Sequence, residues 1–496
     1  MTRWPSVDVA PTPSGWARPG NLMPAVGPSS WPRGRRAASE AEEILASAEA
    51  WWDVERSGFR DGDRYLRNIG TAGSVLNLRL GSSGVANSND PKWLGPEDTG
   101  YVYLPGVASN SFSVPNETAL QITGDIDVRV LVRLDSWKPS ADMALIGKWV
   151  GATASDSWYL RVRTTGTVTL ETSNGTAQIS HASTTSTGLA DGAVSWVRAT
   201  LQVNNGASGH TVKFYLSDDG STWNQFGSDV VTAGTTTINS NTAVVAVGTI
   251  VGALNTSGRF YRAQVLNGIN GTTVLDVDCD AITSGSAASF VATSGQTVTI
   301  NRSTSGRKSV AMPSKTKGGR PCMALGTDDY LECQDSAQHG LLNFAGQMFT
   351  FMVTPRIWGT TSSYVLSKGI VTGAGGGTDM GWVLRNVSGT IRSQTQREVG
   401  TTRTDAIEPS AYANGSLTNH ATTYDATAQT SWLGASAGAR TNHLDGSLRN
   451  SYPFRVGCST QSSSFTDMEF RAAAIWRRAL TTRELATITN AAPWGV

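Results

Sequence analysis

A series of sequence landmarks occurs twice in this chain, about 222 residues apart. The segment from Gly73 to Arg79 resembles that from Gly295 to Arg302. Further pairs follow in the same order: Val130–Trp137 with Phe351–Trp358, Leu145–Lys148 with Leu366–Lys368, Trp158–Arg161 with Trp382–Arg385, Gly166–Thr167 with Gly389–Thr390, and Phe260–Ala263 with Phe470–Ala472. Because order and spacing are both kept, the sequence predicts two copies of one domain of about 200 residues.

The composition and the local patterns indicate that this domain is all-β. Charged residues make up only 16% of the chain and glycine contributes 53 of its 496 residues, as is typical of a protein with many turns. Apolar and polar residues alternate over residues 125–134, 157–163 and 210–216, which places one face of each predicted strand inward. Many short strands of this kind predict sandwiches of two antiparallel sheets.

Four segments follow from the changes in pattern along the chain. Residues 1–36 hold seven of the eighteen prolines with Trp4, Trp16 and Trp31, and predict an extended arm that docks either on a neighbouring subunit or on its own chain. Residues 37–55 predict an amphipathic helix that begins with a capping box at Ser39 and packs on the adjoining domain or between protomers. The two sandwiches are expected over residues 56–286 and 287–496.

Several classes of protein are disfavoured by what the sequence lacks. A net charge of +1 without a cluster of Lys and Arg argues against nucleic-acid binding. The longest nearly apolar run, residues 243–254, is too short to span a bilayer, and the N-terminus carries no secretory signal, so synthesis and first folding are expected in the cytoplasm. Cys279, Cys322, Cys333 and Cys458 lack metal-binding spacing and are predicted to be buried free thiols.

The end of the chain resembles the laminin-G-like, or concanavalin-A-like, jelly-roll family. There a strand, residues 470–476, leads through an Arg-Ala-Leu turn into a short helix beginning near Thr481. Residues 381–385 and 419–425 are similar to other strands of that family. The resemblance implies two tandem concanavalin-A-like sandwiches preceded by the Pro-rich arm and one helix.

Residues 56–315 resemble minor tail proteins of siphophages that infect actinobacteria. The resemblance rests on Gly70–Ser74, Asp90–Trp93, Tyr101–Gly106 and Leu120–Asp127. It implies a non-enzymatic component of the virion tail tip, assembled in the host cytoplasm as a homo-oligomer, that binds host cell-wall glycan, other tail proteins or both. A structural scaffold of the tail tip without any ligand is the alternative.

Catalytic and metal motifs are weak. Glycoside hydrolysis needs two carboxylates flanking the sugar bond, and the nearest strings, residues 125–127 and 276–280, contain no Glu, so a glycan hydrolase is the least favoured function. Asp276, Asp278 and Asp280 match the first positions of a calcium loop, but Ala281 and Ala287 replace its Gly and Glu. No cofactor is predicted, while calcium on other loop carboxylates stays open.

Tryptophan supplies the candidate binding residues. Four tryptophans recur in both copies and are predicted to pack in the cores: Trp137, Trp158, Trp358 and Trp382. Three that occur in one copy, Trp93, Trp223 and Trp432, are candidates for stacking on sugar rings, although each also suits a turn. Trp223 ends the segment from Ser217, which resembles the Asp-box hairpin and predicts a tight turn whose Asp accepts hydrogen bonds from backbone amides.

Overall fold

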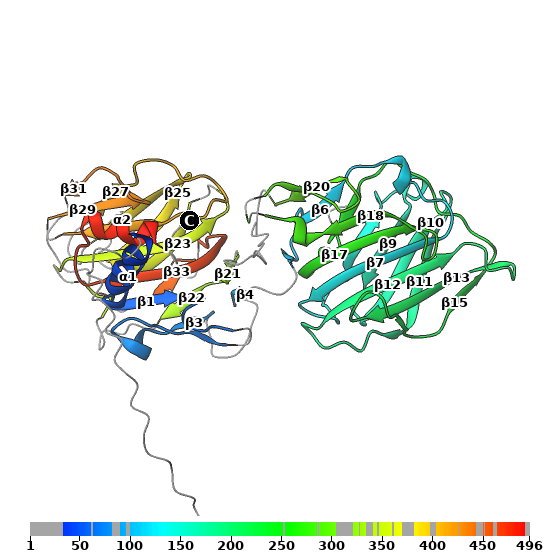
Figure 1. Cartoon of the computed structure of the whole chain (residues 1–496), viewed down its shortest axis with the longest axis horizontal. Coiled ribbons are helices and arrows are strands. Elements are labelled where there is room, and N and C mark those ends of the chain that lie inside the picture. The colour runs from blue at the N-terminus through cyan, green and yellow to red at the C-terminus, as the bar shows by residue number, and fades with distance from the viewer. Residues whose placement is uncertain are drawn as a thin grey trace, which may run out of the picture.

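The computed structural model is an all-β chain folded into two sandwiches, each made of two antiparallel sheets (Figure 1). It describes residues 33–491, except 61–62, 82–89, 96–99, 251–252, 284, 286, 304–320, 327, 334–340, 345–346, 360–361, 370–380, 397–402, 426, 443–449, 451 and 460–463. The predicted arm of residues 1–36 therefore lies outside the described residues except for its last four. The predicted fold class is confirmed.

The first sandwich is formed by residues 101–303, and the second by residues 33–94 together with 321–491. The first contains β5 (Val102–Pro105), β6 (Ser111–Val114), η3 (Thr118–Leu120), β7 (Ile126–Leu134), β8 (Met143–Lys148), η4 (Thr153–Ser155), β9 (Trp158–Val162), β10 (Thr167–Ser173), β11 (Gln178–Ser186), β12 (Val194–Gln202), β13 (Gly209–Ser217), β14 (Asn224–Gln225), β15 (Val230–Ala233), β16 (Val245–Val247), β17 (Ser257–Asn267), β18 (Thr272–Asp278), η5 (Cys279–Ala281), β19 (Ser289–Val291) and β20 (Thr297–Asn301). The second contains α1 (Arg33–Ala46), β1 (Ala50–Asp53), β2 (Tyr65–Leu66), η2 (Gly73–Leu76), β3 (Leu78–Leu80), β4 (Lys92–Leu94), β21 (Cys322–Leu325), β22 (Leu331–Cys333), β23 (Phe349–Ile357), β24 (Ser363–Gly369), β25 (Gly381–Val387), β26 (Thr390–Gln396), β27 (Arg403–Ile407), β28 (His420–Tyr424), β29 (Ala428–Leu433), β30 (Ser436–Ala437), β31 (Thr441–Asn442), β32 (Phe454–Val456), β33 (Met468–Trp476) and α2 (Thr482–Asn490).

The two sandwiches match strand for strand. One sheet of the first runs β11-β10-β9-β8-β16-β6-β20-β19, and its counterpart in the second runs β27-β26-β25-β24-β32-β22-β3-β2. The other sheet runs β13-β12-β7-β17-β18 in the first and β29-β28-β23-β33-β1 in the second. The positions of β18, β19 and β20 are thus taken in the second sandwich by β1, β2 and β3, from the start of the chain.

The two repeats therefore exchange their first three strands. Residues 50–80 open the first sequence repeat but complete the second sandwich, while residues 272–301 open the second repeat and complete the first sandwich. Figure 1 shows the result, because the blue N-terminal strands and the red C-terminal elements lie together in one sandwich. The predicted boundaries, 56–286 and 287–496, are accordingly wrong. A tight turn from β17 into β18 holds residues 272–301 on the first sandwich, whereas β33 leads into α2 and leaves its edge to β1.

The predicted helix over 37–55 is also corrected. The helix α1 covers Arg33–Ala46, so Ser39 lies within it and does not begin it, and β1 follows at once. Trp51 and Trp52 lie on this strand and face opposite sides. Trp52 enters the core of the second sandwich, where it stacks on Phe454 at 5.1 Å and donates from Nε1 to the Leu76 carbonyl at 2.6 Å.

The helices α1 and α2 lie side by side and cover the outer face of the sheet β28-β23-β33-β1 (Figure 1). Their apolar residues pack on Trp51 and Trp476 of that sheet, and Trp476 donates from Nε1 to the Ile44 carbonyl at 2.9 Å. The N-terminus of α2 has the capping box of Thr481 and Glu484. Of the two expectations for the N-terminal helix, packing on the adjoining domain of its own chain is the one found.

A buried lysine recurs at the same place in both sandwiches. Lys148 on β8 and Lys368 on β24 are both fully buried. Lys148 donates to the carbonyl and the side-chain oxygen of Asn241, at 2.5 and 2.7 Å, and Lys368 does the same with Asn450, at 3.3 and 3.1 Å. Burial lowers the pKa of Lys148 to about 8. The sequence repeat thus extends to an interaction that no motif revealed.

The predictions are confirmed for three of the four core tryptophans and for the cysteines. Trp137, Trp158 and Trp382 lie in the cores, whereas Trp358, 8% exposed, is buried outside them with the Arg302 guanidinium 4.4 Å from its ring. All four cysteines are free and buried, and burial raises the pKa of both Cys322 and Cys458 to about 12. Such thiols are protonated at neutral pH and act as small apolar groups.

The stability of the first sandwich is expected to fall in weak acid because of His181. This residue is fully buried, its ring lies 5.1 Å from that of His210, and burial, with His210 adding to it, lowers its pKa to about 4. Between about pH 6.5 and pH 4, His181 is protonated in the unfolded state but neutral in the folded state. The free energy of unfolding is therefore highest above pH 6.5 and falls by up to about 3 kcal/mol as the pH drops to 4. In denaturant unfolding over this range, His181→Gln should show a flatter loss than wild type; parallel pH dependences would contradict the assignment.

Candidate functional site: the cleft between the sandwiches

The two sandwiches meet where the edge of one sheet packs on the face of another. The edge consists of β21 and the added strand β4, which pair through Met323 and Trp93. On the first sandwich, Val102 and Leu104 of β5 point into the core, so Tyr101 and Tyr103 point outward. A buried apolar cluster joins the two surfaces: Leu94, Cys322 and Ala324 with Tyr101, Tyr103 and Tyr261.

Beside this contact lies a cleft of about 340 Å³ that both sandwiches line. The size is at the lower end of the range for small-molecule sites. The second sandwich contributes Phe59, Asp63, Arg64, Leu80, Asp90, Pro91, Lys92, Trp93 and Leu94, and the first contributes Tyr103, Arg133, Asp135, Asp191, Gly192 and Arg259.

Trp93, one of the three predicted binding residues, lies in this cleft. It is partly exposed, and its ring lies so close to the backbone of Gly95 that a side chain there would overlap it. Its buried Nε1 has no acceptor among the described residues. The exposed part of this indole can contact the ring face of a ligand.

Arg259 connects the two walls of the cleft. It extends from β17 of the first sandwich, is only 5% exposed, and donates from Nη2 to the Trp93 carbonyl at 2.8 Å. Its guanidinium lies 4.8 Å from the ring centroid of Tyr101 and 5.9 Å from that of Trp93. These contacts fix the position of Trp93 relative to the first sandwich.

The carboxylates of the cleft are held by donors. Oδ2 of Asp135 accepts hydrogen bonds from Tyr103 at 3.0 Å and Ser257 at 2.6 Å, with the Lys92 ammonium 3.5 Å away. Asp90 forms a bidentate pair with Arg64, at 2.5 and 3.1 Å. The cleft thus presents fixed acceptors and donors beside aromatic rings.

The formal charges of the lining residues cancel. Four cations, Arg64, Lys92, Arg133 and Arg259, face four carboxylates, Asp63, Asp90, Asp135 and Asp191. A neutral polar ligand fits such a balance better than an ion does, and a saccharide combines hydroxyl groups with an apolar ring face that Trp93 can contact.

The other two predicted residues lie elsewhere. Trp432 is 7% exposed, packs in the cluster beneath α1 and α2, and donates from Nε1 to Thr423 at 3.0 Å. Its prediction as a ligand contact is wrong, because the two helices cover the sheet face that carries it. Trp223 is partly exposed and lies on the first sandwich over two arginines, away from the cleft lining. The sequence missed Arg259, Asp135 and Tyr103, of which only Tyr103 had a signal, the outward position in an alternating strand.

The hairpin before Trp223 has the predicted geometry. The carboxylate of Asp219 accepts hydrogen bonds from the amides of Ser221 and Thr222 at 2.8 and 2.7 Å. These bonds hold the pKa of Asp219 well below its usual value. The motif therefore shapes a turn.

Neither a metal cluster nor a membrane span is found within the described ranges. No group of three or more His, Cys, Asp or Glu residues there could hold a metal ion. Of the predicted calcium-like string, Asp276 pairs with Arg262, and Asp278 accepts the Asp280 amide at 2.9 Å. No described helix is long and apolar enough to cross a membrane.

Comparisons with known proteins give distant structural similarity only. No family model and no curated protein sequence matches the chain. The binding domain of Paraclostridial Mosquitocidal Protein 1 is similar over 35% of this chain and 44% of its own length, with 12% identity and a TM-score of 0.29. Domains LG4-5 of the mouse laminin alpha1 chain are similar over 80% of this chain and 96% of their own, with 13% identity and a TM-score of 0.28. Domain 4 of AbnA, a GH43 extracellular arabinanase from Geobacillus stearothermophilus, solved with arabinotriose, is similar over 34% and 76%, with 13% identity and a TM-score of 0.26. The chain thus spans less than half of the first of these proteins.

Proposed function

We propose that this chain is a non-enzymatic glycan-binding protein whose ligand enters the cleft between the two sandwiches. The observation that carries the proposal is Trp93, a partly exposed indole placed among fixed carboxylates and arginines contributed by both sandwiches. This combination offers stacking to a sugar ring and both donors and acceptors to its hydroxyl groups.

Binding without hydrolysis fits the state of the carboxylates. A glycosidase needs one carboxyl group that can protonate the leaving oxygen and a second that acts as nucleophile or base. In the cleft, Asp90 is engaged by Arg64, Asp135 by two hydroxyl groups, and Asp191 accepts the Trp137 amide at 2.7 Å. Carboxylates used in this way orient their neighbours, which suits a binding site.

The biological setting that we propose is the tail tip of a phage that infects actinobacteria, where the chain attaches to host cell-wall glycan and to other tail proteins. This rests on the sequence resemblance of residues 56–315. A scaffold without a ligand is the competing function, and the Pro-rich N-terminal segment next to α1 favours it, because that segment has tryptophans and no core of its own.

Replacing Trp93 by Ala is expected to weaken binding to purified actinobacterial cell-wall polysaccharide by about tenfold, since the loss of a central aromatic contact costs about 1–2 kcal/mol. Affinity electrophoresis or calorimetry would measure it. Trp149→Ala, which removes a partly exposed tryptophan outside the cleft, serves as the matched control. Equal losses in both variants, or no binding by wild type, would refute the cleft site and leave the scaffold; release of reducing sugar would show an enzyme.

A further inference from the structure

In the first sandwich, the outer face of the sheet β13-β12-β7-β17-β18 extends from the cleft to the opposite edge of that sheet. Along β7 the outward residues are Arg133, Leu131, Arg129 and Asp127, because the residues between them belong to the core. Arg133 pairs in register with Arg259 and lies in the cleft. Two rows further on, Arg129 on β7 is directly opposite Arg198 on β12, which in turn is opposite Tyr215 on β13.

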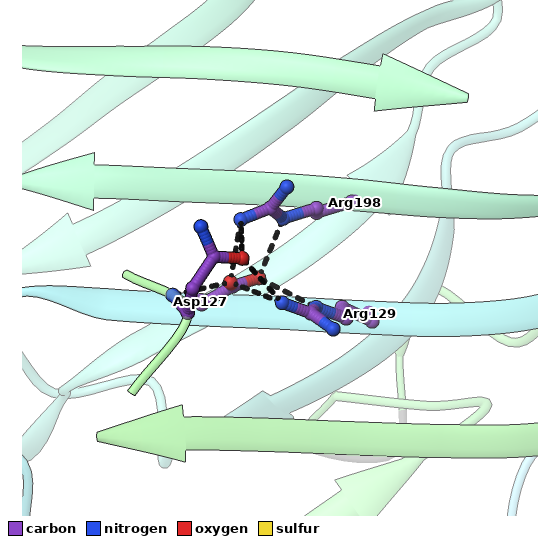
Figure 2. A network of polar contacts seen from close by, with 4 residues as sticks. Asp127, Arg129 and Arg198 are labelled. Carbon is purple, nitrogen blue, oxygen red and sulfur yellow. Dashed lines mark hydrogen bonds and ion pairs between the residues drawn. The ribbon is translucent and has the colours of Figure 1, made fainter. Parts of the chain in front are cut away.

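Asp127 holds these two arginines in a fixed arrangement (Figure 2). Its carboxylate is fully buried and accepts two hydrogen bonds from each guanidinium, at 3.0 and 2.8 Å from Arg129 and at 2.9 and 2.7 Å from Arg198. Both Nη2 groups also donate to the side-chain oxygen of Asn270, at 2.9 and 2.8 Å. Each arginine thus uses Nε and Nη2, and its Nη1 donates to no described residue.

Trp223 completes this site, which we name the arginine platform: Asp127, Arg129, Arg198 and Trp223. The indole centroid lies 5.2 Å from the guanidinium carbon of Arg129 and 5.1 Å from that of Arg198. The Trp196 ring contacts the indole edge-on, with centroids 6.3 Å apart. An indole on two guanidiniums limits their hydration, which strengthens any hydrogen bond that the remaining N–H groups make.

The platform carries the local excess of positive charge. Two guanidiniums share the single carboxylate of Asp127, whereas two other cations of the same sheet have carboxylates of their own: Lys213 pairs with Asp229 at 3.0 Å, and Arg262 with Asp276 and Asp278. One net positive charge in a rigid fork of N–H donors is the arrangement that recognises a carboxylate or a phosphate group.

The second sandwich uses the equivalent face in another way. There the sheet β28-β23-β33-β1 presents apolar residues that α1 and α2 cover: Met352, Ala421, Trp432, Ala472, Ala474 and Trp476. In the first sandwich no described helix covers this face, and it carries arginine and tryptophan in place of the apolar residues. The equivalent faces of the two sandwiches have thus diverged: helices cover the apolar face of the second, and the face of the first is polar.

We propose that the arginine platform binds an anionic group, a carboxylate or a phosphate, of the same polysaccharide whose neutral part occupies the cleft. This rests on the proposed function and specifies its ligand as an acidic polysaccharide. The anion accepts hydrogen bonds from Nη1 of Arg129 and of Arg198, while Trp223 contacts the adjoining sugar. Arg129 and Arg133 are four residues apart on one strand, about 13 Å, so a single polymer chain can contact the platform and the cleft together.

The test uses the full-length chain with three polymers: polygalacturonate for carboxylate, poly(glycerol phosphate) for phosphate, and dextran as a neutral reference. At low ionic strength, at least one anionic polymer should bind more tightly than dextran, and the preferred one identifies the anion. Arg129→Gln should weaken that binding by about tenfold or more, because a charge-assisted hydrogen bond is lost. Asp127 keeps Arg198 and the Asn270 amide in this variant, so the fold is retained.

Controls separate the platform from general charge and from the cleft. Lys213→Gln removes a cation from the same sheet and should leave anionic binding unchanged, whereas Trp223→Ala should weaken it. The proposal is overturned if neither anionic polymer exceeds dextran, if Arg129→Gln and Trp223→Ala both bind like wild type, or if Lys213→Gln loses as much as Arg129→Gln. The cleft is tested separately, by the binding of Trp93→Ala to intact cell-wall polysaccharide. The proposals for the platform and for the cleft can therefore be refuted independently of one another.

Discussion

A fragment of residues 287–496 is expected not to fold on its own, although it matches the second copy of the sequence repeat. It lacks β1, β2, η2 and β3, whose side chains fill the core of the second sandwich: Trp52, Leu66, Leu76, Leu78 and Leu80 are at most 5% exposed. It also carries β19 and β20 without β6, their partner in the first sandwich. The free energy that this buried apolar surface contributes exceeds the free energy of unfolding of an ordinary domain.

Two other fragments should fold, because they follow the strand pairing. Residues 100–303 contain every strand of the first sandwich. A permuted chain that runs from 321 to 491, through a flexible Gly/Ser linker, and on from 40 to 95 restores the second. The linker must run back along α2, about 12 Å from residue 491 to Arg483, because Arg483 lies 3.0 Å from Glu40. Thermal melts followed by circular dichroism would compare the three chains. A cooperative melt of residues 287–496 alone would contradict the exchange of strands.

The repeat was readable from the sequence, but the pairing was not. The match between Gly73–Arg79 and Gly295–Arg302 correctly indicated equivalent strands, now seen as β3 and β20. Similarity shows what kind of strand a segment forms, and equivalent edges on two sandwiches can accept the same strand. The choice depends on the connections: a tight turn joins β17 to β18, while α2 follows β33. Such a choice rests on contacts across more than 200 residues, which local patterns do not encode.

The helix and the tryptophans show the same limit at shorter range. Ile44, Leu45 and Ala48 fit a helical stripe that Trp51 and Trp52 continue in spacing, yet the helix ends at Ala46 and the two tryptophans fall on opposite faces of β1. Trp93 was selected because it occurs in one copy only, and it lines the cleft. Trp432 met the same criterion and is buried, because the sequence does not show that α1 and α2 cover its sheet.

Asp127 is expected to be the most sensitive single position of the first sandwich. Burial alone would raise the pKa of this carboxyl group, but the hydrogen bonds from Arg129 and Arg198 outweigh burial and lower it. Asp127→Ala leaves two guanidiniums, with side chains only 14% and 6% exposed, without their counter-charge. Removing one partner of a buried ionic group costs about 3–5 kcal/mol, so the variant should unfold at markedly lower urea concentration.

The matched control is Asp229→Ala, which breaks the half-exposed pair with Lys213 on the same sheet and should cost less than about 1 kcal/mol. Adding Arg198→Met to Asp127→Ala should recover part of the lost stability, because the penalty comes from the unpaired cation and not from the missing carboxylate. A double variant less stable than Asp127→Ala would mean that Arg198 contributes mainly through packing on Trp223 and Tyr215. Recovery would show that Asp127 stabilises the fold by neutralising part of the charge of Arg129 and Arg198 on this sheet face. Two cations placed there lower the free energy of unfolding unless a bound anion compensates their charge.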